Sequence, residues 1–311
     1  MYIEQGYRGD LGVWKYFFLP LAFIGLMVFN YITLLASPVS TEELMAEMVE
    51  ALGTHWVFVL AVGPLALGLP IVLGWTKFIH PQSIRSLTTS RPRIDWGRVF
   101  FAFAVWGLLT AALTFGDIWL SPDDYRWNFQ WEEFWKLAVL AILLIPLQTS
   151  FEEYLFRGHM MQGLGILSGN RWIPLLVTSL LFGLMHLGNP EVERFGTGVL
   201  VFYIGTGFFL GIVTLMDEGL ELALGFHAAN NLITALLVTA DWTAFQTDSL
   251  YKNISEPDLG WDAFVPVFII FPLLLWLFAR KYGWKNWKDR LAGKVKSREA
   301  ALEAFSKQDT A

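Results

Sequence analysis

The segment TSFEEYLFRG, residues 149–158, places two adjacent carboxylates and a guanidinium within a stretch of otherwise membrane-hydrophobic sequence. Its charged residues are Glu152, Glu153 and Arg157. An ionisable side chain costs roughly 2.5–3.5 kcal/mol at the centre of a bilayer-spanning helix. A chain that keeps three such groups in this position is therefore predicted to be a membrane protein that uses them.

Two further hydrophobic segments carry polar side chains. The first is LLFGLMHLG, residues 180–188, which contains His186, and the second is LGFHAANNLITALL, residues 224–237, which contains His227, Asn230 and Asn231. Polar residues in membrane segments usually face the interior of a helix bundle or a water-filled cavity. The three segments together therefore predict one polar cluster inside a bundle, which makes the chain a candidate intramembrane enzyme.

The composition agrees with a polytopic membrane protein. The chain has 311 residues, of which 55% are hydrophobic and 16% are charged, whereas a soluble domain carries about 25% charged residues. The chain has no cysteine, which excludes disulfides, thiol catalysis and cysteine metal sites. A metal site would have to use oxygen and nitrogen ligands.

Hydrophobic stretches long enough to cross a bilayer recur along the chain. About 20 apolar residues are needed for a span, and the sequence predicts eight, at 14–36, 56–76, 98–120, 134–156, 172–188, 197–216, 220–240 and 262–280. The predicted fold is all-α and polytopic, with about eight transmembrane helices and a catalytic cavity in the bundle. We expect an N-terminal three-span region (1–133), a catalytic helix core (134–240), and a last span with a basic tail (241–311).

Local features refine this layout. The helix that begins at 134 is expected to continue to about Leu164 and to bend near Pro146, because proline disrupts helical hydrogen bonding. Gly207 and Gly211 form a G-x-x-x-G pair that lets neighbouring helices approach closely. The basic tail after 281 is expected to form a helix that lies on anionic lipid.

The distribution of Lys and Arg predicts the orientation. The loop at 77–98 carries five Lys or Arg residues and the tail after the last span carries nine, whereas the loop at 37–54 carries four Glu and no Lys or Arg. Positive residues concentrate on the cytoplasmic side, so eight spans with both termini in the cytoplasm fit. The acidic turn at 217–219 is the exception. We expect an integral protein of a bacterial cytoplasmic membrane.

Helical spacing separates the two carboxylates. Glu153 and Arg157 are four residues apart, so they share a helix face and can pair, while Glu152 is rotated about 100° from Glu153. One carboxylate is then fixed in an ion pair and the other is free to take a proton. A salt bridge at the cytoplasmic end of the helix is the alternative interpretation.

The two imidazoles also have simple structural explanations when each is taken alone. His186 follows Phe182 by four residues and could be a core histidine, and His227 and Asn231 could form a hydrogen bond between helices. Asn230 points elsewhere and is expected to pack. Together, however, these groups supply a general base for water and donors for an oxyanion, or ligands for a divalent metal such as zinc.

The ordered motifs E-E-x-x-x-R, F-x-x-x-H and H-x-x-x-N resemble those of the CPBP family of intramembrane proteases. That family includes type II CAAX prenyl endopeptidases and bacteriocin-processing or immunity-related membrane proteins. The resemblance implies hydrolysis of a peptide bond, with Glu152 as the general base and with Glu153 and Arg157 shaping the site. It further implies that His186 orients water or binds metal, and that His227 and Asn231 steady the oxyanion or share a metal. A divalent metal and a metal-free glutamate mechanism both stay open.

The expected partners are a hydrophobic or lipidated peptide or protein substrate and membrane lipids, with no nucleic acid. For the chemical groups to meet, we expect tilted helices and a water-filled cavity that opens on the cytoplasmic side. Two other functions are compatible with the residues. A proton-coupled transporter also needs intramembrane charges, although the chain has no internal repeat of the kind common in transporters. A non-catalytic immunity or scaffold protein is the other alternative.

Overall fold

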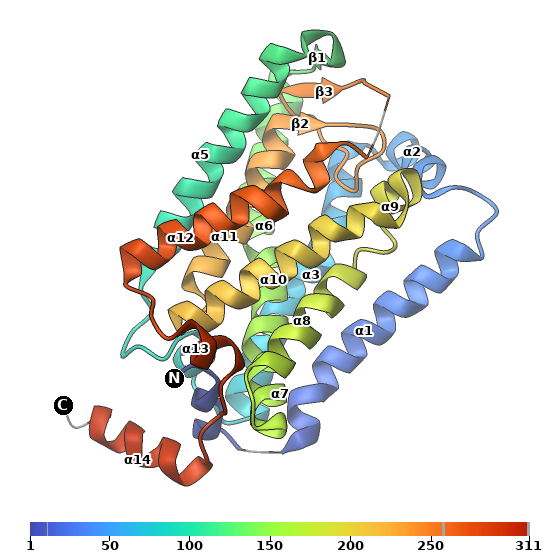
Figure 1. Cartoon of the computed structure of the whole chain (residues 1–311). Helices are drawn as coiled ribbons and strands as arrows, with labels where there is room; N and C mark the ends of the chain where they lie inside the picture. The colour runs from blue at the N-terminus through green and yellow to red at the C-terminus, as the bar shows by residue number, and fades with distance from the viewer. Residues whose placement is uncertain (11, 257–258, 310–311) are drawn as a thin grey trace.

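The computed structural model describes residues 1–10, 12–256 and 259–309. Figure 1 shows a bundle of long helices, with a small sheet at one end and both chain termini at the other. We call these the sheet end and the terminal end. Among the described residues, five helices are long and apolar enough to cross a membrane: Trp14–Leu35, Thr54–Ile79, Trp96–Leu120, Trp131–Ser168 and Pro190–Asp217. The predicted all-α polytopic membrane fold is confirmed.

The main helices follow one another with short connections. Their bounds are α1 (Val13–Leu35), α2 (Thr41–Leu52), α3 (Thr54–Gly74), α4 (Ile84–Thr88), α5 (Trp96–Leu120), α6 (Trp131–Glu153), α7 (Met161–Ser168), α8 (Trp172–Leu184), α9 (Pro190–Phe195), α10 (Leu200–Asp217), α11 (Glu221–Leu237), α12 (Phe271–Tyr282), α13 (Trp287–Ala292) and α14 (Arg298–Asp309). Short 3₁₀ and π segments join them: η1 (Ile3–Arg8), η2 (Trp75–Ile79), η3 (Pro122–Asp124), η4 (Tyr154–Met160), η5 (Gly196–Val199), η6 (Trp261–Ala263) and η7 (Pro266–Ile270). Every one of the eight predicted spans contains a helix, but α8, α11 and α12 have only 13, 17 and 12 residues.

The helix that carries the two carboxylates is unusually long. It runs for 38 residues from Trp131 to Ser168, so it continues past the predicted end at Leu164. The α6 helix contains Pro146 without interruption, and the departure from α geometry is the π segment η4 that directly follows Glu153. Such π segments are rare and occur frequently at functional sites.

Glycines let the helices of the core approach closely. A Cβ on Gly225 of α11 would lie 2.0 Å from the Val99 carbonyl oxygen of α5, and a Cβ on Gly207 of α10 would lie 2.5 Å from the Ser179 carbonyl oxygen of α8. Real Cβ atoms do not approach that closely, so these positions require glycine. The residues of α11 from 221 to 229 are all buried, and this helix is therefore enclosed by protein over its first half.

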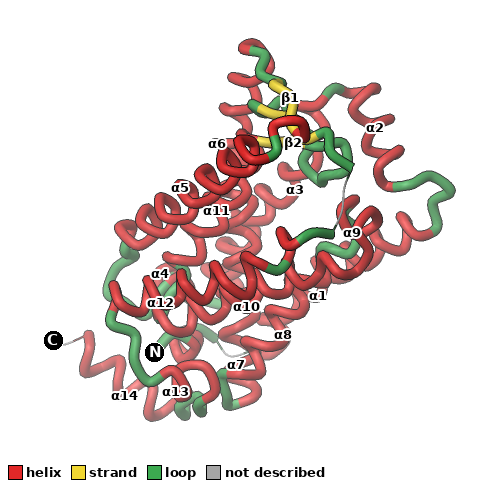
Figure 2. The backbone as a smooth tube through the Cα atoms, turned by 45° about the horizontal axis from the view of Figure 1, so that its top comes forward, coloured by secondary structure: helices red, strands yellow, loops and turns green. Residues whose placement is uncertain are grey.

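The sheet end was not predicted from the sequence. Strands β1 (Tyr125–Trp127), β3 (Tyr251–Asn253) and β2 (Val238–Thr239) form a small sheet in that order, with β1 antiparallel and β2 parallel to β3. Figure 2 shows this sheet at the end of the helices, close to α6 and α11. Its strands connect the 121–133 and 241–261 loops by hydrogen bonds, whereas the sequence predicted only that these loops lie on the same side of the membrane.

The terminal end explains why an acidic turn lies among basic loops. Asp217 pairs with Arg91 at 2.6 Å and also with Arg98, and Glu221 pairs with Arg91 at 3.1 Å. The carboxylates of the turn region thus neutralise arginines of the 77–98 loop. Both termini lie at this end (Figure 1), in agreement with an even number of crossings, and its cytoplasmic location stays a prediction.

The basic tail forms two helices, α13 and α14, rather than the single helix expected. Its apolar side chains do not all face lipid, because Val295, Ala301 and Phe305 are buried in one cluster with Ile3 and Tyr7 of η1. The tail is therefore part of the folded terminal end. Its contact with anionic lipid stays a prediction.

Candidate active site

Glu153 and Arg157 form a fully buried ion pair. Arg157 Nη1 donates to Glu153 Oε1 at 3.0 Å, and Arg157 Nη2 donates to the Gly207 carbonyl oxygen at 3.1 Å. The guanidinium also lies 4.2 Å from the centroid of the Phe182 ring. The pairing predicted from the spacing is present. Arg157 thereby links the π segment η4 to α8 and α10, so we interpret the Glu153–Arg157 pair as a structural contact of the core.

Glu152 is in a different environment from its neighbour. Its Oε1 accepts a hydrogen bond from Gln148 Nε2 at 2.7 Å, while its Oε2 lies 3.5 Å from His227 Nε2. The other ring nitrogen of His227, Nδ1, lies 2.9 Å from Glu153 Oε1. Because an ionised carboxylate can only accept, Nδ1 carries a ring hydrogen, while Nε2 faces Glu152. The two carboxylates therefore hold one imidazole between them.

His186 lies just beyond the end of α8, on the turn toward α9. Its Nδ1 lies 2.8 Å from the Phe182 carbonyl oxygen, so it donates the ring hydrogen there. The ring stacks on Tyr203 of α10, with centroids 4.1 Å apart and an interplanar angle of 15°. These two contacts fix the ring and leave Nε2 as the free nitrogen. Tyr203 escaped the sequence analysis because α10 shows only an apolar, glycine-rich pattern.

A chain of amides completes the cluster. Asn231 Nδ2 donates to Gln148 Oε1 at 3.2 Å, and Gln148 in turn donates to Glu152. The expectation that Asn230 points away from the cluster is wrong, because it lines the same cavity and its Nδ2 donates to Asn231 Oδ1 at 3.1 Å, while its Oδ1 accepts from Trp106 Nε1 at 3.0 Å. Gln148 is a site residue that the sequence analysis missed. Its position four residues before Glu152 on a helix was the available signal.

A cavity of about 360 Å³ lies beside these groups. Its polar wall includes Glu152, His186, His227 and Asn231. Elsewhere it is lined by apolar side chains of α1 and α3 and by the loop after β2, at Thr243, Ala244 and Phe245. The cavity therefore extends from the polar cluster toward the sheet end. The buried pair of Glu153 and Arg157 and the packed η1 segment lie toward the end with the termini. The expectation that the cavity opens on the cytoplasmic side stays a prediction.

The chemistry of the cluster suits a divalent metal. His186 and His227 each commit Nδ1 to an oxygen acceptor and keep Nε2 free, and zinc-bound histidines characteristically have such a partner on the second nitrogen. Glu152 Oε2 would be the third ligand. Within the described residues, however, these three side chains do not bring one ligand atom each within 4.8 Å of the others.

The comparisons with known proteins concern the segment that carries this site. Residues 131–233 match the family model described as type II CAAX prenyl endopeptidase Rce1-like. A protein of Bacillus subtilis (strain 168), described as "Uncharacterized protein YyaK", is 28% identical over 274 residues, which cover 84% of this chain and 89% of the relative. No solved structure matches the chain. The matched segment begins at the first residue of α6 and ends in α11, so the resemblance carried by the three motifs is confirmed: over this third of its length, the chain is similar to the type II CAAX prenyl endopeptidases.

Proposed function

We propose that this protein is an intramembrane endopeptidase that hydrolyses a peptide bond with water activated by Glu152. One observation carries the proposal. Of two adjacent carboxylates, Glu153 is engaged in a buried ion pair, while Glu152 lines a cavity and keeps one oxygen beside an imidazole. A carboxylate in that setting can take a proton from water and return it, as a general base must.

The hydrolytic step uses few groups. Water between Glu152 and the imidazoles attacks the carbonyl carbon of the scissile bond and gives its proton to Glu152. The resulting oxyanion accepts a hydrogen bond from Asn231, whose amide has a second N–H beyond the one that it donates to Gln148. The carbon–nitrogen bond then breaks and Glu152 returns the proton to the leaving amine, so the products are a carboxylic acid and an amine.

Glu152, His186 and His227 would hold a divalent metal if one is bound. Such an ion lowers the pKa of a bound water and polarises a carbonyl oxygen. The orienting contacts are the same in either case: Gln148 orients Glu152, Glu153 orients His227, and Tyr203 orients His186.

The substrate class follows from the cavity walls. Phe23 and Met27 of α1 and Leu65 of α3 face the same cavity as the polar cluster. We propose that an apolar or lipidated peptide segment lies against these side chains while its peptide bond lies at Glu152. A protein of the bacterial cytoplasmic membrane would meet such substrates within the lipid or at its surface.

The test compares purified wild-type protein with Glu152→Gln in detergent. Each would be incubated with pools of prenylated and unmodified peptides, and products would be identified by mass spectrometry. We expect cleavage by the wild type and a loss of at least about a thousandfold in Glu152→Gln. Glu132→Gln, which removes an exposed carboxylate of the same helix, is the matched control. Equal cleavage by wild type and Glu152→Gln would refute the role of this carboxylate.

A further inference from the structure

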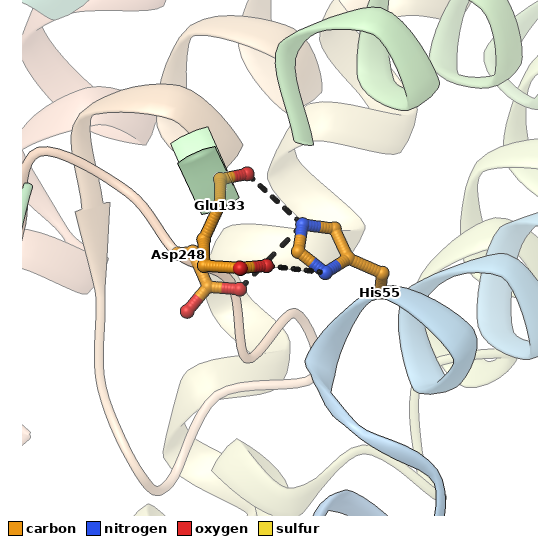
Figure 3. Close-up of side chains that lie close together, drawn as sticks. All are labelled: His55, Glu133 and Asp248. Atoms are coloured by element: carbon orange, nitrogen blue, oxygen red, sulfur yellow. Dashed lines mark hydrogen bonds and ion pairs between the residues drawn. The ribbon is translucent and has the colours of Figure 1, made fainter. Parts of the chain in front are cut away.

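A second group of possible metal ligands lies at the sheet end, away from the candidate active site. Figure 3 shows His55 of α3, Glu133 of α6 and Asp248 of the loop between β2 and β3 pointing toward one another. One ligand atom from each lies within 4.8 Å of the others. All three residues are half-buried. Segments far apart in the sequence therefore converge on one point.

The hydrogen-bond pattern of His55 favours a cation beside its Nδ1. Its Nε2 lies 3.0 Å from the Glu133 carbonyl oxygen, so this nitrogen carries the ring hydrogen. Its Nδ1 faces Glu133 Oε2 at 3.4 Å. In a neutral imidazole that contact would oppose two lone pairs. A proton or a metal ion between these atoms removes the conflict.

The surrounding charges favour a metal. Lys136 binds Glu133 through the other oxygen, Oε1, at 2.9 Å, and this leaves Oε2 available. Asp248 adds a second carboxylate, whose Oδ2 lies 3.7 Å from His55 Nε2. Two carboxylates and one ammonium leave a net charge of −1 when the histidine is neutral. Imidazole nitrogen and carboxylate oxygen are both ligand types that zinc accepts, and water could fill the remaining position.

We propose that His55, Glu133 and Asp248 form a binding site for a divalent cation of the zinc class. The backbone hydrogen bond on His55 Nε2 fixes the tautomer that presents Nδ1, as outer partners do at known metal sites. Zinc requires ligand atoms at roughly 2.0–2.2 Å, so the Asp248 carboxylate, which lies beside Nε2, would have to turn toward Nδ1 when the ion binds. This site does not depend on the proposed peptidase activity.

The cation would also affect the candidate active site through the loop that it binds. The loop after β2 carries Asp248, and a few residues earlier Thr243, Ala244 and Phe245 line the active-site cavity. Ala244 N–H donates to Glu191 Oε1 at 2.8 Å, which holds that part of the loop against α9. A metal on Asp248 would fix the other part to α3 and α6. The cavity wall would then be held at both of its ends.

The test counts zinc on the purified protein in detergent. Zn²⁺ binding to wild type, Asp248→Asn and His55→Gln would be measured by titration against a chromophoric chelator at pH 7.5. We expect each variant to lose one equivalent, or to bind it at least tenfold more weakly. The difference in bound Zn²⁺ between wild type and variant reports on this site alone, because any zinc at the candidate active site contributes equally to both proteins. The matched control is Asp241→Asn, which removes an exposed carboxylate that pairs with Lys252 on the same loop.

A second measurement separates metal from proton. Thermal unfolding of Asp241→Asn and Asp248→Asn would be followed with and without Zn²⁺, and we expect zinc to stabilise only the former through this site. Unchanged zinc stoichiometry and affinity in both Asp248→Asn and His55→Gln would overturn the proposal. Stabilisation by acid alone, with no zinc effect that depends on Asp248, would show that a proton occupies the position and would also overturn it.

Discussion

Replacing Glu153 with glutamine should lower the melting temperature of the protein strongly, whereas the same change at the adjacent Glu152 should barely alter it. Glu153→Gln removes the charge that balances Arg157, whose side chain has no exposed surface. Removing one partner of a buried ion pair costs about 3–5 kcal/mol, because the other charge is left uncompensated. For a chain of this size each kcal/mol corresponds to roughly 2 °C in melting temperature. Glu153→Gln should therefore unfold roughly 6–10 °C below the wild type.

Glu152→Gln should unfold within about 2 °C of the wild type. The buried Arg157 is paired with Glu153, so the charge of Glu152 is not needed to balance it. A glutamine at position 152 can still accept the hydrogen bond from Gln148. The assay is tryptophan fluorescence during heating of the purified proteins in one detergent. The double variant Glu153→Gln/Arg157→Met should recover at least half of the loss, because a buried pair can often be replaced by neutral groups. Equal melting temperatures for the two single variants would refute this assignment of the carboxylates.

Three further predictions concern residues around the cluster. Gln148→Leu should lower the rate of peptide cleavage about tenfold, because it frees both Glu152 and the amide of Asn231. Tyr203→Ala should lower the same rate about two- to tenfold while Tyr203→Phe keeps it, because the stack on His186 is worth about 0.5–1.5 kcal/mol and needs only the ring. At the terminal end, burial lowers the pKa of His80 to about 4 from an ordinary 6.5. The unfolded chain thus binds the proton first as the pH falls, and wild type should lose about 2 kcal/mol relative to His80→Leu between pH 7.5 and pH 5.

Each of these predictions has a clear contrary result. Cleavage kinetics would contradict the first if Gln148→Leu matched the wild type. They would contradict the second if Tyr203→Phe and Tyr203→Ala were equally slow. For His80, the measurement is thermal unfolding at both pH values, and parallel loss of stability in the wild type and His80→Leu would argue against a buried neutral imidazole.

The sequence predicted the membrane fold and the identity of the polar cluster because both leave local signals. Charged residues in apolar segments are costly and therefore conspicuous, and a separation of four residues on a helix fixes which side chains share a face. The pairing of Glu153 with Arg157 followed from spacing alone. The catalytic roles of the cluster stay predictions.

What the sequence could not provide depends on contacts between distant segments. Tyr203 meets His186 only because α10 packs on α8, and Gln148 resembles any other helical residue until Asn231 is placed beside it. The end of the bundle toward which the cavity extends depends on where the N-terminal segment η1 packs, and the sequence does not show that position. The strands at the sheet end are two or three residues long, too short for an alternating pattern to appear.

The enclosure of α11 has a consequence for how the protein is made. This helix has 17 residues and carries Glu221, His227 and two asparagines, and it is not among the helices apolar enough to cross a membrane by their own composition. Partition into lipid therefore favours the insertion of this helix less than that of the five longer apolar helices. Its place in the fold depends on packing against α5, α6 and α10, where Gly225 meets the backbone of α5. Substitution of Gly225 would then appear first as a defect of insertion and quality control, with degraded protein in the cell, before any effect on chemistry could be measured.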